Sequence, residues 1–187
     1  YKGQQKKKYG FLAANNASLF IREYSPTLGN DDAKVYLIKF TDPACETCSA
    51  FHPFVKQLMD AHPGKIKLVI RYNPLHEGAD FPVKILEAAR KQGKFWEFHD
   101  MLFSSYNRLN DQKIQEIVDL LSLDEIKFKE QQKNPNITKR IRQDYEEGIR
   151  LGVRGTPTIF INGKKLRNRG MKSMESVIEK ELQKQQG

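Results

Sequence analysis

The stretch that decides the fold is Phe40-Thr-Asp-Pro-Ala-Cys-Glu-Thr-Cys-Ser-Ala-Phe-His-Pro53, which contains both cysteines of the chain, Cys45 and Cys48. Residues 34–40 (KVYLIKF) are rich in β-branched and aromatic side chains and predict a buried strand. Residues 49–61 place apolar side chains at helical spacing. The cysteines therefore stand where a strand passes into a helix. Free backbone N–H groups and the helix dipole favour a thiolate at the first cysteine, and the second lies about one turn further on, within reach of a disulfide.

A C-x-x-C array has two other common uses, a structural disulfide and half of a zinc site. A ring of four residues closes too short a loop to stabilise the chain much. The sequence has no second cysteine pair, and His52 supplies only a third ligand where structural zinc takes four. The spacing and its context favour redox chemistry at Cys45 and Cys48, without a metal.

The composition fits one domain, or one domain with a large insertion, in 187 residues. No apolar run approaches transmembrane length, so we expect a soluble chain. The chain begins at Tyr1 rather than at methionine, which is compatible with a removed signal peptide or anchor. Two cysteines in one motif suit a catalyst in an oxidising compartment, and equally a cytosolic reductase.

The net charge of +9 makes nucleic-acid binding an obvious hypothesis. The basic clusters lack interleaved aromatic residues, and no recognition motif accompanies them. We therefore interpret them as a solvated tail and an exposed edge, with non-specific attraction to acidic proteins or anionic lipid left open. The clusters are Lys2, Lys6, Lys7 and Lys8 near the start, and Lys164, Lys165, Arg167, Arg169 and Lys172 near the end.

The remaining chain predicts strands on both sides of a helical block. Residues 1–17 predict a tail with a short ordered piece near Tyr9–Leu12, residues 18–24 an edge strand, and residues 25–32 a turn-rich connection. Pro53 should kink the first helix, which stops at residues 62–64. Further strands are expected at 66–71, at 156–161 and, after an Asn162-Gly163 hairpin, at 164–167. Further helices are expected at 81–92, 94–106, 111–121 and 124–133, from Asn134-Pro135 to Gly152, and at 173–183 with Ser173 as N-cap.

This order of elements predicts an α/β fold, with a mixed central sheet flanked by helices and an inserted all-helical domain. We assign residues 1–31 to a basic tail and edge segment, residues 32–74 and 151–187 to the sheet domain, and residues 75–150 to the insertion.

From residue 32 onward the chain resembles the thioredoxin fold, and within it the DsbA-like thiol:disulfide oxidoreductases. The strand before Cys-Glu-Thr-Cys, the helix proline Pro53, Gly155-Thr-Pro-Thr158 before a strand, and the closing hairpin and helix carry the resemblance. It implies that Pro157 is cis and faces the cysteines, and that Thr156 and Pro157 bind substrate as an added strand. Cys48 and Pro157 are 109 residues apart (157 − 48), which leaves room for the helical insertion typical of this branch.

The motif departs from the family in two places. The family often has an acidic residue six positions before the first cysteine, where this chain has Lys39. Strand alternation turns Lys39 toward the covered face of the sheet, where an ammonium favours a thiolate, although a lysine at a strand end also snorkels to water. Glu46 and Thr47 replace the inner dipeptide of the oxidising C-P-H-C members. We expect Glu46 to raise the pKa of the Cys45 thiol, against Lys39, so that Glu46, Thr47 and Lys39 tune the thiolate.

The resemblance implies dithiol–disulfide exchange, with Cys45 exposed at the helix start and forming a mixed disulfide that Cys48 resolves. It favours an oxidase of exported proteins that needs no cofactor beyond its own disulfide. We expect unfolded or cysteine-containing proteins as substrates, a membrane redox partner that recycles the disulfide, a periplasmic or otherwise extracytoplasmic location, a monomer, and no nucleic acid. His62, His76 and His99 form no evident constellation in the sequence.

Other readings of the pair remain open. An isomerase or a reductase has the same fold, and Thr before the cis-proline resembles those relatives. A cytosolic glutathione-linked member needs a glutathione site. A chaperone or assembly module could use the cysteines to hold a metal.

Overall fold

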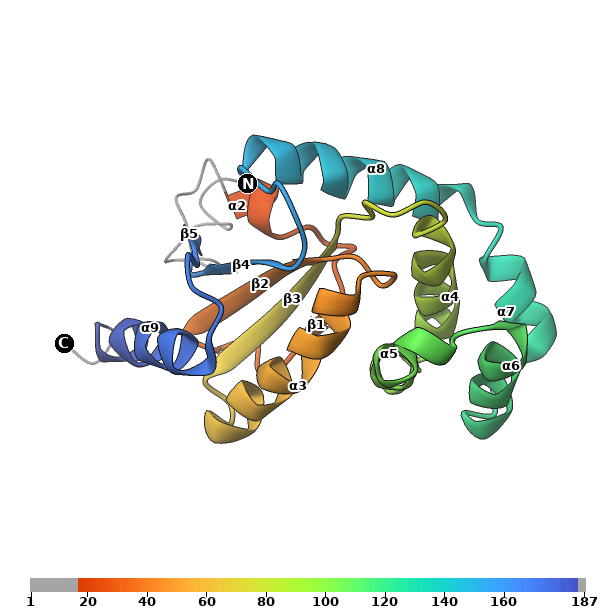
Figure 1. Cartoon of the computed structure of the whole chain (residues 1–187), viewed down its shortest axis with the longest axis horizontal. Helices are drawn as coiled ribbons and strands as arrows, with labels where there is room; N and C mark the ends of the chain where they lie inside the picture. Colours follow the sequence, from red (N-terminus) through yellow and green to blue (C-terminus); the bar gives the residue numbers. More distant parts are fainter. Residues whose placement is uncertain (1–16, 185–187) are drawn as a thin grey trace.

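The computed structural model describes residues 17–184, and its centre is one five-stranded sheet (Figure 1). The strands lie in the order β1-β3-β2-β4-β5. β2 and β3 are parallel, whereas the other neighbours are antiparallel, so the sheet is mixed, as the sequence predicts. The strands are β1 (Thr27–Leu28), β2 (Val35–Thr41), β3 (Ile66–Tyr72), β4 (Thr158–Ile161) and β5 (Lys164–Lys165).

Helices connect the strands, and most of them lie between β3 and β4 in the chain. α3 (Glu46–Ala61) follows β2, and α9 (Met171–Gln183) follows β5. The block between β3 and β4 consists of α4 (Asp80–Lys91), α5 (Phe95–Ser104), a 3-10 turn (Tyr106–Arg108), α6 (Asp111–Leu120), α7 (Glu125–Gln131) and α8 (Pro135–Arg150). Figure 1 shows α4, α5, α6 and α7 together on one side of the sheet, with α8 returning to it. This is a thioredoxin fold with a helical insertion. Within residues 17–184, no helix is both long enough and apolar enough to cross a membrane.

Both faces of the sheet are covered, so every residue of β2 is buried. Val35 and Leu37 belong to a core cluster shared with α3 and α9. Ile38 and Phe40 belong to a second cluster on the opposite face, where α2 (Ala17–Phe20) contributes Phe20. Because side chains alternate along a strand, Lys39 shares its face with Val35 and Leu37, beneath α3.

The N-terminal part of the fold differs from the prediction. Residues 18–24 form no edge strand, since α2 covers Ala17–Phe20 and the edge strand β1 lies within the expected turn region. The apolar residues Phe20 and Ile21 are each 6% exposed. A short helix buries such a pair as well as a strand does, and a short apolar run does not distinguish the two. The suggested piece near Tyr9–Leu12 lies outside the described residues.

The C-terminal elements lie where they are predicted, although β4 begins at Thr158, β5 ends at Lys165 and the closing helix begins earlier than expected. Asn162 and Gly163 have φ values of +47° and +80°, as the expected two-residue hairpin requires. α9 begins at Met171 with Gly170 as its N-cap, so Ser173 is not the cap. The side chain of Asn168 accepts a hydrogen bond from the Gly170 backbone N–H at 2.8 Å, which turns the chain into the helix earlier.

A buried group of charges fastens α8 to the sheet. Arg71 of β3 is fully buried, and its Nε lies 2.7 Å from Oδ1 of Asp144, while its second guanidinium nitrogen pairs with Glu147. Gly148 lets the helix approach closely, because a Cβ there would come within 3.2 Å of the Phe40 ring. The helical block is thus returned to the sheet beside the chain segment that enters β4.

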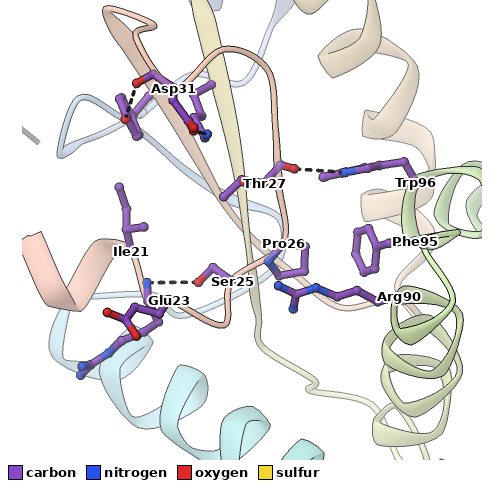
Figure 2. A pocket seen from close by; sticks show the side chains of 13 residues that line it. Ile21, Glu23, Ser25, Pro26, Thr27, Asp31, Arg90, Phe95 and Trp96 are labelled. Atoms are coloured by element: carbon purple, nitrogen blue, oxygen red, sulfur yellow. Dashed lines mark hydrogen bonds and ion pairs between the residues drawn. The ribbon is translucent and has the colours of Figure 1, made fainter. Parts of the chain in front are cut away.

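A second junction joins the block to β1 and to the segment just before it. Figure 2 shows Trp96 and Arg90 reaching from the helical side toward this segment across a pocket of about 350 Å³. Trp96 Nε1 donates a hydrogen bond to the Thr27 carbonyl at 3.1 Å, and Arg90 donates one to the Tyr24 carbonyl. The cysteine motif contributes no residue to this pocket.

We expect Arg71→Met to destabilise the protein by about 3–5 kcal/mol, because it leaves two buried carboxylates without their central partner. The measurement is the free energy of unfolding by urea at pH 7. Arg150→Met, at an exposed position on α8, is the matched control. A loss no larger than that of the control would show that the buried charges do not hold α8 to the sheet.

Candidate active site

The two cysteines lie at the start of α3, where the sequence places them. Cys45 is the N-cap of the helix, and its sulfur accepts a hydrogen bond from the Cys48 backbone N–H at 3.4 Å. The Cys45 N–H in turn donates to the Asp42 carbonyl at 3.0 Å. A sulfur in the N-cap position faces the free N–H groups of the first turn, which stabilise a negative charge. Both thiols are free in this structure.

The two sulfurs differ in their access to solvent. Cys45 is 7% exposed and Cys48 is fully buried. Cys45 is therefore less exposed than expected, because the chain at Thr156 covers part of the residue. Cys45 is still the only one of the two that a substrate can reach without opening the fold.

The chain before β4 forms the other wall of the site. The Thr156–Pro157 peptide bond is cis, and the Thr156 carbonyl oxygen lies 3.7 Å from the Cys45 sulfur. The Pro157 carbonyl accepts a hydrogen bond from Arg169 Nη1 at 2.8 Å. Thr158 donates through its hydroxyl to the Gly155 carbonyl at 2.7 Å. The structure thus brings together Cys45, Thr156 and Pro157, although the substrate-binding role of the last two stays a prediction.

The surroundings shift the acidities of the two thiols in opposite directions. Burial disfavours the Cys45 thiolate, but hydrogen bonding with the Thr156 side chain and with the backbone of Cys48 and Thr47 outweighs it, so the pKa of Cys45 is lowered. For Cys48 burial is the larger effect and raises the pKa above that of an ordinary thiol. The accessible sulfur is therefore the better thiolate and the buried sulfur the better thiol.

Lys39 lies behind the cysteines and is 1% exposed, so it does not snorkel to water. Its ammonium nitrogen lies 4.9 Å from the centre of the Phe103 ring and has no hydrogen-bond partner among residues 17–184. Burial lowers the pKa of Lys39 to about 8, while charge interactions with Cys48 and Cys45 oppose this shift. A largely protonated lysine thus faces both sulfurs from inside the fold.

Glu46 and Thr47 occupy the first two positions of α3, and both are exposed. The Thr47 backbone contributes to the lowered pKa of Cys45. A carboxylate at Glu46 is screened by water on its outer side, so its effect on the thiol should be small. The tuning role of both residues stays a prediction.

Asp42 is a residue of the site that sequence reasoning missed. Its carboxylate is fully buried and accepts backbone hydrogen bonds from Ala44 at 2.8 Å and from Leu75 at 3.0 Å. It also lies 2.5 Å from Nδ1 of His76. Asp42 therefore ties the loop before Cys45 to the loop after β3. An aspartate three residues before Cys45 was the available signal, but its partners Leu75 and His76 lie more than thirty residues further along the chain.

A histidine cluster between α3 and α5 was also missed. His52 Nε2 lies 2.8 Å from Oδ1 of Asp100, and the rings of His52 and His99 are 4.8 Å apart. The expectation that His99 belongs to no constellation is wrong, because α5 packs beside α3 and brings residues nearly fifty positions apart into contact. Burial lowers the pKa of His99 to about 3. Burial also opposes ionisation of Asp100, but hydrogen bonds from His52 and Lys56 hold its pKa below the ordinary value.

Comparison with known proteins agrees with this geometry. A family model described as Thioredoxin matches residues 22–180. A thioredoxin-like oxidoreductase from Silicibacter pomeroyi DSS-3 is 30% identical, with 89% of this chain and 96% of that chain covered and a TM-score of 0.79. The thiol-disulfide exchange protein alpha-DsbA2 from Wolbachia pipientis has a TM-score of 0.80 over 95% of this chain and 97% of that chain; at 23% identity, this is a likeness of fold.

The relatives that are similar in sequence include proteins of two kinds. A probable disulfide bond formation protein D from Bacillus anthracis is 28% identical over 181 residues, which are 89% of this chain and 82% of that protein. The Na(+)/H(+) antiporter NhaA 3 from Salinispora tropica is 31% identical over 140 residues, which are 73% of this chain but 21% of that protein. The chain therefore spans only about a fifth of this antiporter relative.

We expect Lys39→Met to be more stable than the parent at pH 7, by up to roughly 3 kcal/mol, because it removes a buried charge without a hydrogen-bond partner. The lysine pKa is about 8 in the fold against 10.5 ordinarily, so between these pH values the unfolded chain binds more protons than the folded chain. The stability of the parent should therefore rise with pH across that window, and the advantage of the variant should shrink.

The measurement is urea unfolding from pH 7 to about pH 10, with the exposed Lys65→Met as control. A Lys39→Met protein that is less stable than the parent at pH 7 would contradict a buried charged lysine. An advantage that does not change with pH would contradict its titration in this window.

Proposed function

The chain belongs to the thioredoxin family, in its DsbA-like branch of thiol:disulfide oxidoreductases, and we propose that it oxidises pairs of thiols in exported proteins. The segment shared with the disulfide bond formation protein covers most of that protein's length, whereas the segment shared with the antiporter does not. Because the antiporter shares only about a fifth of its length with this chain, the proposed activity is derived from the cysteine site and not from ion transport.

The observation that carries the proposal is the asymmetry between the two sulfurs. The pKa of Cys45 is lowered and that of the buried Cys48 is raised, and Cys45 lies against the Thr156 carbonyl where a substrate chain can approach. A low pKa makes Cys45 the better leaving group and stabilises the reduced form of the pair. A pair whose reduced form is stabilised is an oxidant.

The exchange then has two steps. A substrate thiolate attacks the sulfur of Cys45 in the oxidised protein, the disulfide bond breaks, and Cys48 leaves with the electron pair and takes up a proton. A second substrate thiolate attacks the substrate sulfur of this mixed disulfide, so that the substrate disulfide forms and Cys45 leaves as a thiolate. Two electrons pass from two substrate thiols to the cysteine pair.

The geometry favours extended protein segments as substrates. Cys45 and the Thr156 carbonyl are adjacent, so one strand placed along residues 155–157 can bond to the backbone while its cysteine reaches Cys45. Unfolded or cysteine-containing proteins supply such segments. Repeated turnover needs an oxidant that removes two electrons, for which we propose a membrane redox partner. Both requirements fit a location outside the cytoplasm, where disulfides persist.

We expect Cys48→Ser to retain mixed disulfides through Cys45, because the resolving thiol is gone. Cys45→Ser should retain almost none, since it keeps only a fully buried sulfur. The reduced variants are mixed with a disulfide-containing model protein, quenched with acid, and examined by mass spectrometry. The double serine variant is the control for non-covalent association. Equal trapping by the two single variants would overturn the assignment of roles.

We expect the reduction potential of the pair to lie nearer that of an oxidase, about −120 mV, than that of thioredoxin, about −270 mV. Equilibration in glutathione buffers measures it. Lys39→Met should lower the potential by roughly 30 mV for each pKa unit by which Cys45 rises, because the ammonium no longer stabilises the thiolate.

Lys65→Met is the control for this measurement. A parent potential near that of thioredoxin would favour a reductase, the main alternative of the same fold. An unchanged potential in Lys39→Met would exclude Lys39 as a residue that tunes the pair.

A further inference from the structure

The cluster of His52, His99 and Asp100 joins two helices beneath the motif and has no part in the exchange steps. Each of the three residues offers one ligand atom, and these atoms lie within 4.8 Å of one another. His52 comes from α3, whereas His99 and Asp100 come from α5. Two imidazoles and a carboxylate on facing helices form a donor set that binds transition metals.

His99 is the unusual member of the cluster. It is 1% exposed, and within the described part of the chain neither of its ring nitrogens has a hydrogen-bond partner. Its Nδ1 is 3.8 Å from the nearest Asp100 oxygen, which is too long for a hydrogen bond. A buried imidazole without partners is less favourable than one whose nitrogens are satisfied. The arrangement leaves a nitrogen lone pair available near a carboxylate and a second imidazole.

We propose that His52, His99 and Asp100 bind one divalent transition-metal ion of the zinc class. Zinc takes imidazole nitrogen and carboxylate oxygen together, and a set of three protein ligands leaves the remaining position to water. The carboxylate of Asp100 already orients His52, so the donors are partly organised before a metal arrives. This departs from the sequence-based expectation that the chain holds no metal, which considered only the cysteines and His52.

The ion can reach this cluster from the surface. The Asp100 side chain is 37% exposed, and it lines a small groove of about 100 Å³ together with His52, Lys56 and Trp96. The groove lies between α3 and α5, whereas Cys45 faces Thr156 at the helix start. The metal site and the entry of the substrate are therefore separate.

Two ammonium groups oppose a dication here. Lys56 lies 2.5 Å from Oδ2 of Asp100, but its side chain is 53% exposed and can turn into water. Lys39 is buried and interacts electrostatically with His99, so it cannot withdraw. Its positive charge weakens the binding of a dication, so the metal affinity of a variant without Lys39 can also be measured. Removing Lys39 should strengthen binding, whereas removing a ligand should weaken it.

The test is calorimetric titration of tag-free, oxidised full-length protein with Zn²⁺, because the disulfide removes both thiolates as ligands. We expect one ion per chain. Even an outer-shell partner of a ligand is worth roughly 10–100-fold in affinity, so His99→Phe and His52→Gln should each weaken binding by at least about tenfold. Lys39→Met should bind more tightly than the parent. The double variant C45S/C48S provides a parallel background in which the cysteines cannot contribute under any redox condition.

His62→Asn is the matched control, since this histidine lies outside the cluster. His99→Phe keeps a ring in contact with Phe103, which stacks on His99 at 4.3 Å, so its melting temperature without metal should not fall. If the melting temperature of His99→Phe does fall, the zinc affinity of His52→Gln alone tests the proposal. Absence of one-to-one binding to the parent, undiminished binding to both ligand variants, or an equal loss in His62→Asn would each overturn the proposal. None of these outcomes depends on the direction of thiol exchange.

Discussion

The buried pairing of Arg71 with Asp144 and Glu147 is the interaction on which the site depends. Arg71 belongs to a central strand, and its partners belong to the last helix of the block. That helix leads directly into the segment with Thr156 and Pro157. Buried ion pairs add little net stability, but an unpaired buried charge is costly, so this contact strongly disfavours any other docking of α8. The wall opposite Cys45 is thereby fixed from the far side of the sheet.

The chemistry at Cys45 results from two backbone features and one side chain. The N-cap position offers N–H groups to the sulfur, and the chain at Thr156 excludes much of the solvent from it. Lys39 adds a positive charge from inside the fold. The first two features are made by the backbone, whereas the third depends on a single side chain. The same backbone could therefore support different reduction potentials through the residue at the position of Lys39.

The sequence predicts what local pattern determines. The C-x-x-C array at a strand-to-helix junction, the Asn162-Gly163 turn and the Asn134-Pro135 helix start each depend on neighbours in the chain, and the structure has each element there. Contacts made by the tertiary fold were not predictable. Arg71 and Asp144 are 73 residues apart, and His52 and Asp100 are 48 apart. The hydrophobic periodicity of the sequence does not indicate such pairings. The ion pairs of Arg71 and the histidine cluster are therefore visible only in the structure.

For Lys39, strand alternation correctly predicts which face of the sheet carries the side chain, but it does not predict whether the ammonium group is buried. Alternation along β2 places its side chain beneath α3, but alternation cannot tell whether a long side chain turns back to water. The sheet is covered on both faces, so the ammonium stays inside against Phe103 without a hydrogen bond. An apolar residue would be less costly there. The cost is partly offset in the reduced protein, where the thiolate of Cys45 supplies negative charge near the lysine. A lysine that destabilises the fold but favours the thiolate form makes the stability of the protein depend on its redox state.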